Sequence, residues 1–167
     1  RSGGFSAHVH QRLMIGQVAL YQVPDREQAC QEILNQKDQL LEIANQAYPS
    51  IVKRGGGARE IRVEKVSGQT DFLVVYLHVD TQEAMGANML NTMLEALKPH
   101  LESLSRGQSL MGILSNYATE SLVTSSCRIA FHYLSPNKDE ARELADKIVL
   151  ASHFAQADPY RAATHNK

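Results

Sequence analysis

One stretch of the sequence combines acidic and small residues in a pattern that suits phosphate binding. Asp80 and Glu83 stand three residues apart, which is the spacing of a capping box at the start of a helix. The residues that follow are small, namely Ala84, Gly86 and Ala87. Small residues let a phosphate or pyrophosphate approach the unpaired, partly positive N–H groups of a helix start. The alternative is an ordinary amphipathic helix that shows its asparagines to water.

Three other residues have side chains suited to catalysis or binding. Lys167 can donate a charge-assisted hydrogen bond to an oxygen that gains negative charge, and the guanidinium of Arg161 suits a carboxylate. Asn116 follows an apolar run, where a strand is expected to end. Residue type alone favours plainer interpretations: a solvated lysine, a surface arginine at a helix start and a turn asparagine.

Two long motifs resemble a single family. EAMGANMLNTMLEAL, from Glu83, is similar to the DAMGxN dinucleotide-binding signature of bacterial (class II) 3-hydroxy-3-methylglutaryl-coenzyme A (HMG-CoA) reductases. DPYRAATHNK, from Asp158, resembles the segment that carries the catalytic lysine of that family. The upstream run KDQLLEIANQ…GGGARE follows the family as well, so the resemblance covers nearly the whole chain. Glu83 replaces the commoner aspartate of the signature and keeps its charge.

The resemblance implies a role for individual residues. Lys167 would be the catalytic lysine with His165 as its neighbour, and Arg161 would bind the carboxylate of the hydroxymethylglutaryl group. The cofactor-binding residues that it implies are Glu83, Met85, Gly86, Ala87, Asn88, Asn116, Tyr48 and Arg54. The family's catalytic glutamate, aspartate and histidine would lie outside residues 1–167, so we expect the chain alone to be inactive.

The segment before the three glycines bears on the choice of cofactor. Members of the family that use NADH place an acid there, and an ungapped alignment puts Tyr48 at that position. Tyr48 does not repel a 2′-phosphate, and Lys53, Arg54 and Arg59 stand near enough in sequence to attract it. We therefore predict NADPH as the preferred cofactor, with NADH as the alternative. No metal is expected, since the histidines form neither HExxH nor a cluster with cysteine.

The order of the elements predicts an α+β fold. Apolar periodicity and breakers place a strand over 13–23, a helix over 25–47 that ends before Pro49, and a hairpin with strands over 60–66 and 72–79. The helix of the signature and a strand over 109–116 follow. The β-α-β-β-α-β order is that of a ferredoxin-like fold, an antiparallel sheet with two helices on one face. The glycine-rich segment 53–59 is either a plain connector or a border of the cofactor cleft.

Beyond Asn116 the pattern changes. RIAFHYL within 122–133 is a candidate strand, 137–154 reads as a helix, and Pro159 opens a helical turn. By resemblance, we expect residues 1–10 to be a connector from the large domain and 11–116 to be the small ferredoxin-like NAD(P)-binding domain. Residues 117–167 would return into a truncated large substrate-binding domain as a helical segment.

Composition narrows the class of protein. The chain has 167 residues and a net charge of −1, so it has no global attraction to nucleic acid or membrane. Cys30 and Cys127 show no paired spacing and suit a reduced, cytoplasmic protein. No apolar run approaches the roughly 20 residues that span a bilayer. The absence of an initiator methionine leads us to expect an internal fragment of a longer protein.

These observations lead to one main hypothesis and two alternatives. By resemblance, the parent enzyme interconverts HMG-CoA and mevalonate plus CoA by two hydride transfers, as a homodimer or larger homo-oligomer. A non-catalytic ferredoxin-like module for RNA or a small ligand is the first alternative, although the RNP-like aromatic pattern is absent. A plain oligomerisation module is the second.

Overall fold

The computed structural model describes residues 3–165 of the chain. They divide into two compact units. The first, Val9–Val123, is called the sheet unit below, and the second, formed by the residues up to His8 and from Thr124 onward, is called the terminal unit. Each unit is described by itself.

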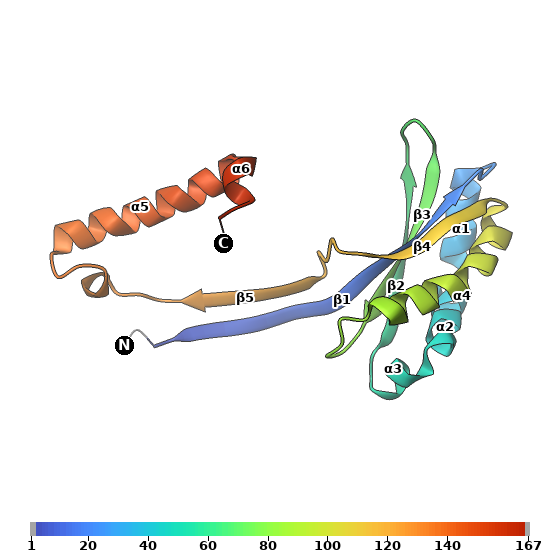
Figure 1. Cartoon of the computed structure of the whole chain (residues 1–167), viewed down its shortest axis with the longest axis horizontal. Coiled ribbons are helices and arrows are strands. Elements are labelled where there is room, and N and C mark those ends of the chain that lie inside the picture. Colours follow the sequence, from blue (N-terminus) through green and yellow to red (C-terminus); the bar gives the residue numbers. More distant parts are fainter. Residues whose placement is uncertain (1–2, 166–167) are drawn as a thin grey trace. The chain divides into compact units, whose positions relative to one another are not determined.

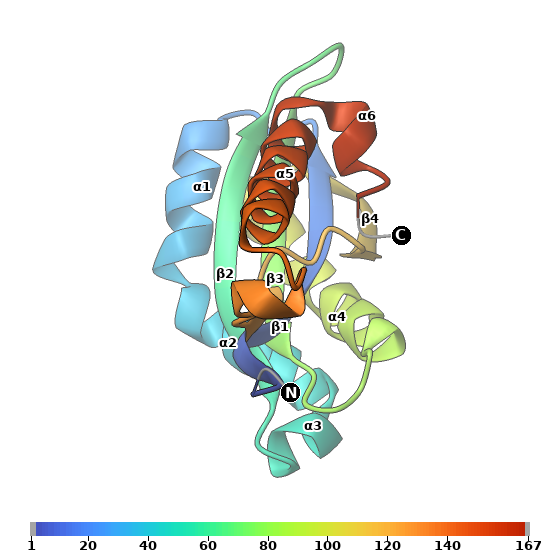
Figure 2. The same cartoon turned by 90° about the vertical axis from the view of Figure 1, so that its left-hand side faces the viewer.

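Four strands form the main path of a five-stranded sheet, whose fifth strand is described below. They are β1 (Phe5–Tyr21), β2 (Gly57–Val66), β3 (Phe72–Asp80) and β4 (Gln108–Ser115). They lie in the order β2-β3-β1-β4, and every neighbouring pair is antiparallel (Figure 2). With helices between β1 and β2 and between β3 and β4, this topology confirms the ferredoxin-like α+β prediction.

The helices between β1 and β2 differ from the prediction in two respects. The single helix expected over 25–47 is two, α1 (Arg26–Asn35) and α2 (Lys37–Ala47), which meet at Gln36. Gln36 has φ −100° and ψ 15°, and neither glycine nor proline marks the break in the sequence. Asp25 caps α1 as predicted, because its carboxylate accepts hydrogen bonds from the N–H groups of Glu27 and Gln28. Pro49 begins a short helix, α3 (Pro49–Lys53).

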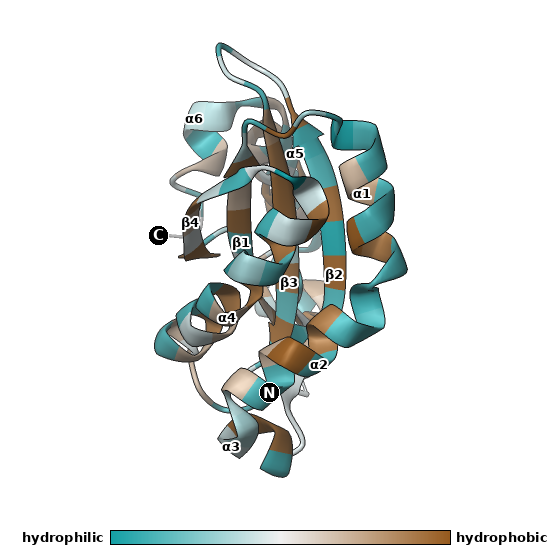
Figure 3. Ribbon diagram, turned by 90° about the vertical axis from the view of Figure 1, so that its right-hand side faces the viewer, coloured by the Kyte–Doolittle hydropathy of each residue, from teal (hydrophilic) through white to brown (hydrophobic). Residues whose placement is uncertain are grey.

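The core lies between the sheet and the helices that cover one of its faces. Figure 3 looks onto this face, with α1, α2 and α4 (Ala87–Ser105) in front of the strands. Side chains alternate along a strand, so Leu77 joins the core while its neighbours Tyr76 and His78 face the other side. The largest fully buried side chains are Leu20, Ile33, Leu40, Ile51, Ile61, Leu73, Leu77, Leu90, Met93, Leu94, Leu97 and Leu101.

Close packing of α4 on the sheet depends on two glycines. A Cβ atom at Gly16 of β1 would lie 2.7 Å from Cδ1 of Leu94, and one at Gly112 of β4 would lie 3.1 Å from Cβ of Leu94. Neither position can carry a side chain without moving the helix or its leucine. The register of α4 on the sheet, and hence the position of its first turn, is set in part by these glycines.

The last elements of the chain begin with a strand that continues from the sheet unit into the terminal unit. β5 (Ser121–Cys127) pairs with β1 and is followed by a 3₁₀ turn, η1 (Phe131–Tyr133), and by α5 (Lys138–Ala157) and α6 (Pro159–Ala162) (Figure 1). The prediction of a strand in RIAFHYL is wrong, because β5 ends at Cys127, before this segment begins. The N–H of Tyr133 bonds the carbonyl of Ala130 at 2.9 Å, which makes a tight turn there. The helix expected over 137–154 and the helical turn at Pro159 are confirmed. Residues 5–10, which were expected to belong to a connector, form the first part of the strand β1.

Candidate functional site

The loop before α4 departs from the predicted capping box. The helix begins at Ala87, and Asp80 is the last residue of β3, so Asp80 is not its N-cap and Glu83 does not complete a box. The carboxylate of Asp80 instead accepts hydrogen bonds from the backbone N–H and the side-chain amide of Gln82, at 2.9 and 3.0 Å. Thr81 closes the loop, since its hydroxyl donates to the carbonyl of Ala84 at 2.6 Å.

The start of α4 is nevertheless open. Its N-cap is Gly86, with φ 88° and no side-chain hydrogen bond to the first turn. A Cβ there would lie 2.4 Å from Cγ2 of Thr81, so glycine is required both for the left-handed backbone and for the close approach. Met85 is 67% exposed, and Asn88, the second residue of α4, is exposed as well. The N–H groups of the first turn therefore remain available to an anion.

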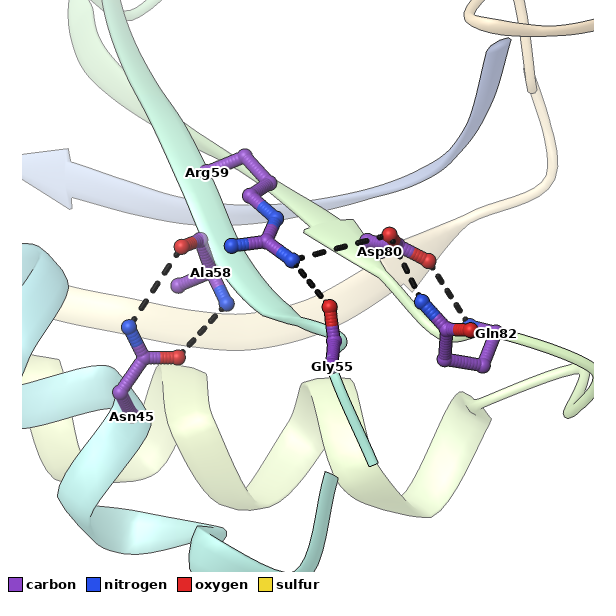
Figure 4. A network of polar contacts seen from close by, with 6 residues as sticks. All are labelled: Asn45, Gly55, Ala58, Arg59, Asp80 and Gln82. Atoms are coloured by element: carbon purple, nitrogen blue, oxygen red, sulfur yellow. Dashed lines mark hydrogen bonds and ion pairs between the residues drawn. The ribbon is translucent and has the colours of Figure 1, made fainter. Parts of the chain in front are cut away.

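The glycine-rich segment lies against the end of β3. Gly57 pairs with Asp80 in the β2–β3 ladder, and a Cβ at Gly56 would lie 2.4 Å from the backbone carbonyl oxygen of Asp80. The guanidinium of Arg59 donates to the carbonyl of Gly55, and its Nη2 lies 3.7 Å from Oδ2 of Asp80 (Figure 4). The two loops that the sequence singled out are thus joined by Asp80 and Arg59.

Asn45 of α2 holds the same segment from the other side. Its side-chain oxygen accepts a hydrogen bond from the N–H of Ala58 at 2.7 Å, and its amide nitrogen lies 3.5 Å from the carbonyl of the same residue (Figure 4). A Cβ at Gly57 would lie 2.4 Å from Oδ1 of Asn45, so glycine also permits this contact. Sequence reasoning missed Asn45, although an asparagine inside an amphipathic helix is a weak signal of a tertiary role.

Arg12 is a second residue that sequence reasoning missed. Its Nη1 donates to Oε1 of Glu83 at 2.8 Å, which links β1 to the loop before α4. Beside this pair lies a hollow of ≈ 400 Å³, lined by residues 9–13 and Asp80. The Glu83 side chain is 92% exposed, so its bond to Arg12 is readily exchanged for a bond to a ligand. No motif in the sequence marked Arg12.

The residues proposed to select the cofactor surround α3. Tyr48 joins α2 to α3, is half-buried and packs against the core cluster. Arg54 caps α3 and is exposed, with its Nε donating to the carbonyl of Ser50 at 3.3 Å. Lys53 is exposed as well. All of them precede the glycines that adjoin Asp80.

The remaining candidates lie outside this group of residues. Asn116 is exposed just after β4, with no hydrogen bond to the loop before α4 within 3–165. Arg161 lies in the terminal unit, where its Nη2 donates to the carbonyl of Thr164 at 2.8 Å and its buried Nε has no partner among the described residues. His165 follows that segment, and Lys167 lies outside the described residues.

Three further observations concern metal ligands, thiols and membrane-spanning helices. Within residues 3–165, no group of three histidine, cysteine, aspartate or glutamate side chains could hold a metal ion. Cys30 and Cys127 are free thiols. Over the same described range, no helix has both the length and the apolar character needed to cross a membrane.

The fold and the site define a class of protein. An antiparallel ferredoxin-like sheet carries an uncapped helix start, and a glycine-rich loop with nearby cations adjoins it. This is an α+β unit with the features of an anion- or nucleotide-binding module.

Comparison with known proteins identifies the family. The sequence profile described as hydroxymethylglutaryl-coenzyme A reductase matches residues 1–167. The 3-hydroxy-3-methylglutaryl-coenzyme A reductase of Archaeoglobus fulgidus is 37% identical over 169 residues, which cover 99% of this chain and 37% of the relative. A probable enzyme of the same name from Borreliella burgdorferi is 30% identical over 115 residues, 69% of this chain and 26% of the relative.

Solved structures agree with the sequence comparison. The class II 3-hydroxy-3-methylglutaryl-CoA reductase of Streptococcus pneumoniae, bound to NADPH in open conformations, is 75% identical with a TM-score of 0.94, covering 99% of this chain and 45% of that chain. A second structure of the S. pneumoniae enzyme gives a TM-score of 0.95 and covers 39% of that chain. The chain belongs to the hydroxymethylglutaryl-coenzyme A reductase family, and it spans less than half the length of these relatives.

Proposed function

We propose that this chain is the cofactor-binding part of a class II HMG-CoA reductase and that it binds NADPH beside the start of α4. The main support for this proposal is that Gly86, at φ 88°, leaves the first turn of α4 without a side-chain cap. The loop before this turn is linked to the glycine-rich segment by Arg59 and Asp80. The pyrophosphate would lie at these N–H groups. The nicotinamide side of the site would be completed by Glu83, Met85, Ala87, Asn88 and Asn116.

The 2′-phosphate would be bound by the cations around α3. Arg54 and Lys53 are exposed at the end of this helix, and Tyr48 supplies no carboxylate to repel a phosphate. Arg59 is near the same loop, but its guanidinium is engaged with Gly55 and Asp80. NADPH should therefore bind more tightly than NADH, and Arg54 should account for more of the difference than Arg59.

In the complete enzyme, the bound cofactor would deliver hydride twice, converting HMG-CoA to mevalonate and CoA. Lys167 would stabilise the oxygen that gains negative charge, and Arg161 would bind the carboxylate of the hydroxymethylglutaryl group. The division of the chain at Val9 and Val123 supports a small cofactor domain over 11–116, flanked by segments 1–10 and 117–167 of a substrate domain. We propose further a cytoplasmic homodimer or larger homo-oligomer, with no nucleic-acid or membrane partner.

Calorimetric titration of the chain with NADPH and, separately, with NADH tests the cofactor site. We expect saturable NADPH binding that is stronger than NADH binding and that weakens in Glu83→Ala and Arg54→Ala. Lys138→Ala, a charge change at the start of α5, is the matched control and should leave the affinity unchanged. Equal binding of both cofactors would remove the role given to Tyr48 and Arg54, and turnover of HMG-CoA by the chain alone would contradict the roles assigned to groups outside it.

A further inference from the structure

A second hollow lies on the sheet unit, and it contains no residue of the loop before α4. It has a volume of ≈ 270 Å³ and is lined in part by Arg62 and Glu64 of β2, Tyr76 and His78 of β3, and Tyr117 after β4. Tyr76 and His78 alternate with the core residue Leu77, so this hollow is on the face that the helices leave open. It is called the His78 cavity below.

His78 is a buried polar side chain with an unmet hydrogen bond. It is 2% exposed, and its Nδ1 is buried with no hydrogen-bond partner among the described residues. Burial and the nearby Arg62 lower the pKa of His78, so the imidazole is neutral at pH 7 and one ring nitrogen is an acceptor. Buried polar atoms are normally satisfied, and this one would be satisfied by a hydrogen-bond donor.

The charges around the cavity favour a cation over an anion. The only cation among the lining residues named above, Arg62, lies 3.0 Å from Oε2 of Glu60 and 3.3 Å from Oε1 of Glu120. Glu64 has no ion pair among the residues that the structure describes. With Lys37, whose charge also acts on Glu60, two cations stand against three glutamates, which leaves a local excess of one negative charge. An anion would have to separate Arg62 from its carboxylates, whereas a cation would pair with Glu64.

Two tyrosines supply aromatic surface at the same place. Tyr117 is 81% exposed, and Tyr76 is half-buried beside Glu64, where burial and that carboxylate raise the pKa of its hydroxyl. The faces of tyrosine rings attract ammonium and guanidinium groups. The carboxylate of Glu64, the imidazole acceptor of His78 and the aromatic faces together suit a cation that carries N–H donors.

We propose that the His78 cavity binds a positively charged nitrogen group, an ammonium or a guanidinium. Its N–H groups would donate to the carboxylate of Glu64 and to the imidazole of His78, with the ring of Tyr117 against its face. The group belongs either to a small organic cation in solution or to a lysine or arginine side chain of a second copy of this chain. The site is independent of the cofactor site proposed above.

Methylguanidinium is the probe, and the ring proton resonance of His78, assigned with His78→Gln, is the readout. Titration of the chain at constant ionic strength should give a saturable shift with methylguanidinium and none with phosphate. Glu64→Gln should weaken the binding about two- to fivefold, which corresponds to the loss of one exposed charge pair. Glu32→Gln, which removes an exposed carboxylate on α1, is the matched control and should leave the titration unchanged.

The result that overturns the cation site is the absence of a saturable shift with methylguanidinium, or identical titrations for Glu64→Gln and Glu32→Gln. Tyr117→Ala gives an independent check, since this exposed side chain can be truncated without disturbing the core, and it too should weaken binding. A dilution series without added cation separates the two sources. Movement of the His78 resonance toward the bound position as the chain is concentrated identifies a side chain of a second copy, and a constant resonance identifies a free small cation.

Discussion

Arg59 and Asp80 join the glycine-rich loop to the end of β3, with Nη2 of the arginine 3.7 Å from Oδ2 of the carboxylate. The same guanidinium donates to the carbonyl of Gly55, and the same carboxylate accepts from Gln82 in the loop before α4. One arginine and one aspartate therefore hold together the two segments proposed to surround NADPH, although neither needs to touch the cofactor to do so.

Replacing Arg59 by glutamine should weaken NADPH binding and destabilise the fold only modestly. The ion pair is partly exposed, so its loss should reduce the free energy of unfolding by no more than about 1 kcal/mol. The two loops would lose their common tether, and we expect the dissociation constant for NADPH to rise about three- to tenfold. Titration calorimetry and urea unfolding measure the two effects. Arg26→Gln, which breaks the Arg26–Asp71 pair, is the control and should leave NADPH binding unchanged.

Gly86→Ala should damage the cofactor site through the backbone. A left-handed conformation costs a residue with a Cβ roughly 1–2 kcal/mol, and the new atom would meet Cγ2 of Thr81. We expect reduced stability and a loss of NADPH affinity as the first turn of α4 shifts. The double variant Gly86→Ala/Thr81→Ser, which removes that methyl group and keeps the hydroxyl, should recover part of the affinity.

Gly68→Ala provides the comparison for this prediction. Gly68 lies in the β2–β3 turn, where the nearest atom to an added Cβ would be 3.9 Å away. The free energy of unfolding of the Gly68→Ala variant should differ from that of the parent chain by no more than about 0.5 kcal/mol, and its NADPH affinity should match that of the parent chain. Equal effects at Gly68 and Gly86 would contradict the role given to the conformation of Gly86.

Asn45→Ala should destabilise the sheet unit by leaving the buried N–H of Ala58 without an acceptor. Loss of such a partner costs about 1–3 kcal/mol. Asn45→Asp keeps an oxygen for the 2.7 Å bond and loses only the weaker contact at 3.5 Å, so it should be the milder variant. Urea unfolding of both variants, with Gln46→Ala on the exposed side of α2 as control, measures the difference. If the aspartate variant were as unstable as the alanine variant, the 2.7 Å hydrogen bond to the N–H of Ala58 would not be the more important of the two contacts.

The sequence predicts the order of the elements well because breakers and periodicity are local properties. Asp25 and Pro49 mark boundaries that the structure keeps, whereas β2 begins at Gly57, three residues before the strand expected over 60–66. The split of the expected helix at Gln36 and the end of β5 at Cys127 are not predictable in this way, because no residue with a special backbone preference marks either place. Tertiary packing decides both.

The candidate site shows the same limit. The small residues before α4 indicate an open helix start, yet the spacing of Asp80 and Glu83 suggests a capping box that does not form. Asp80 instead completes β3, where it pairs with Gly57, and its carboxylate serves the loop and Arg59. Contacts between residues distant in sequence, such as Arg12 with Glu83 and Asn45 with Ala58, depend on strand register and could not be predicted from local patterns.

The buried His78 should make the chain less stable at mildly acidic pH. Burial, reinforced by Arg62, lowers the pKa of this imidazole below its ordinary value of 6.5. The unfolded chain therefore binds more protons than the folded chain as the pH falls through 6.5, and the free energy of unfolding decreases until the folded imidazole is also protonated. Glu60, whose pKa is lowered by its hydrogen bond to Arg62, adds a separate loss of stability only below its ordinary pKa of 4.5.

Urea unfolding of the parent chain and of His78→Gln between pH 7.5 and pH 5 separates these contributions, because glutamine does not titrate. We expect the parent chain to lose stability as the pH falls below about 6.5 and the variant to lose clearly less over the same interval. Below pH 4.5 both should lose stability together as Glu60 is protonated. Parallel curves for the two proteins above pH 5 would mean that His78 is protonated as readily in the folded chain as in the unfolded chain, and its imidazole would then not be the neutral acceptor on which the cation site depends.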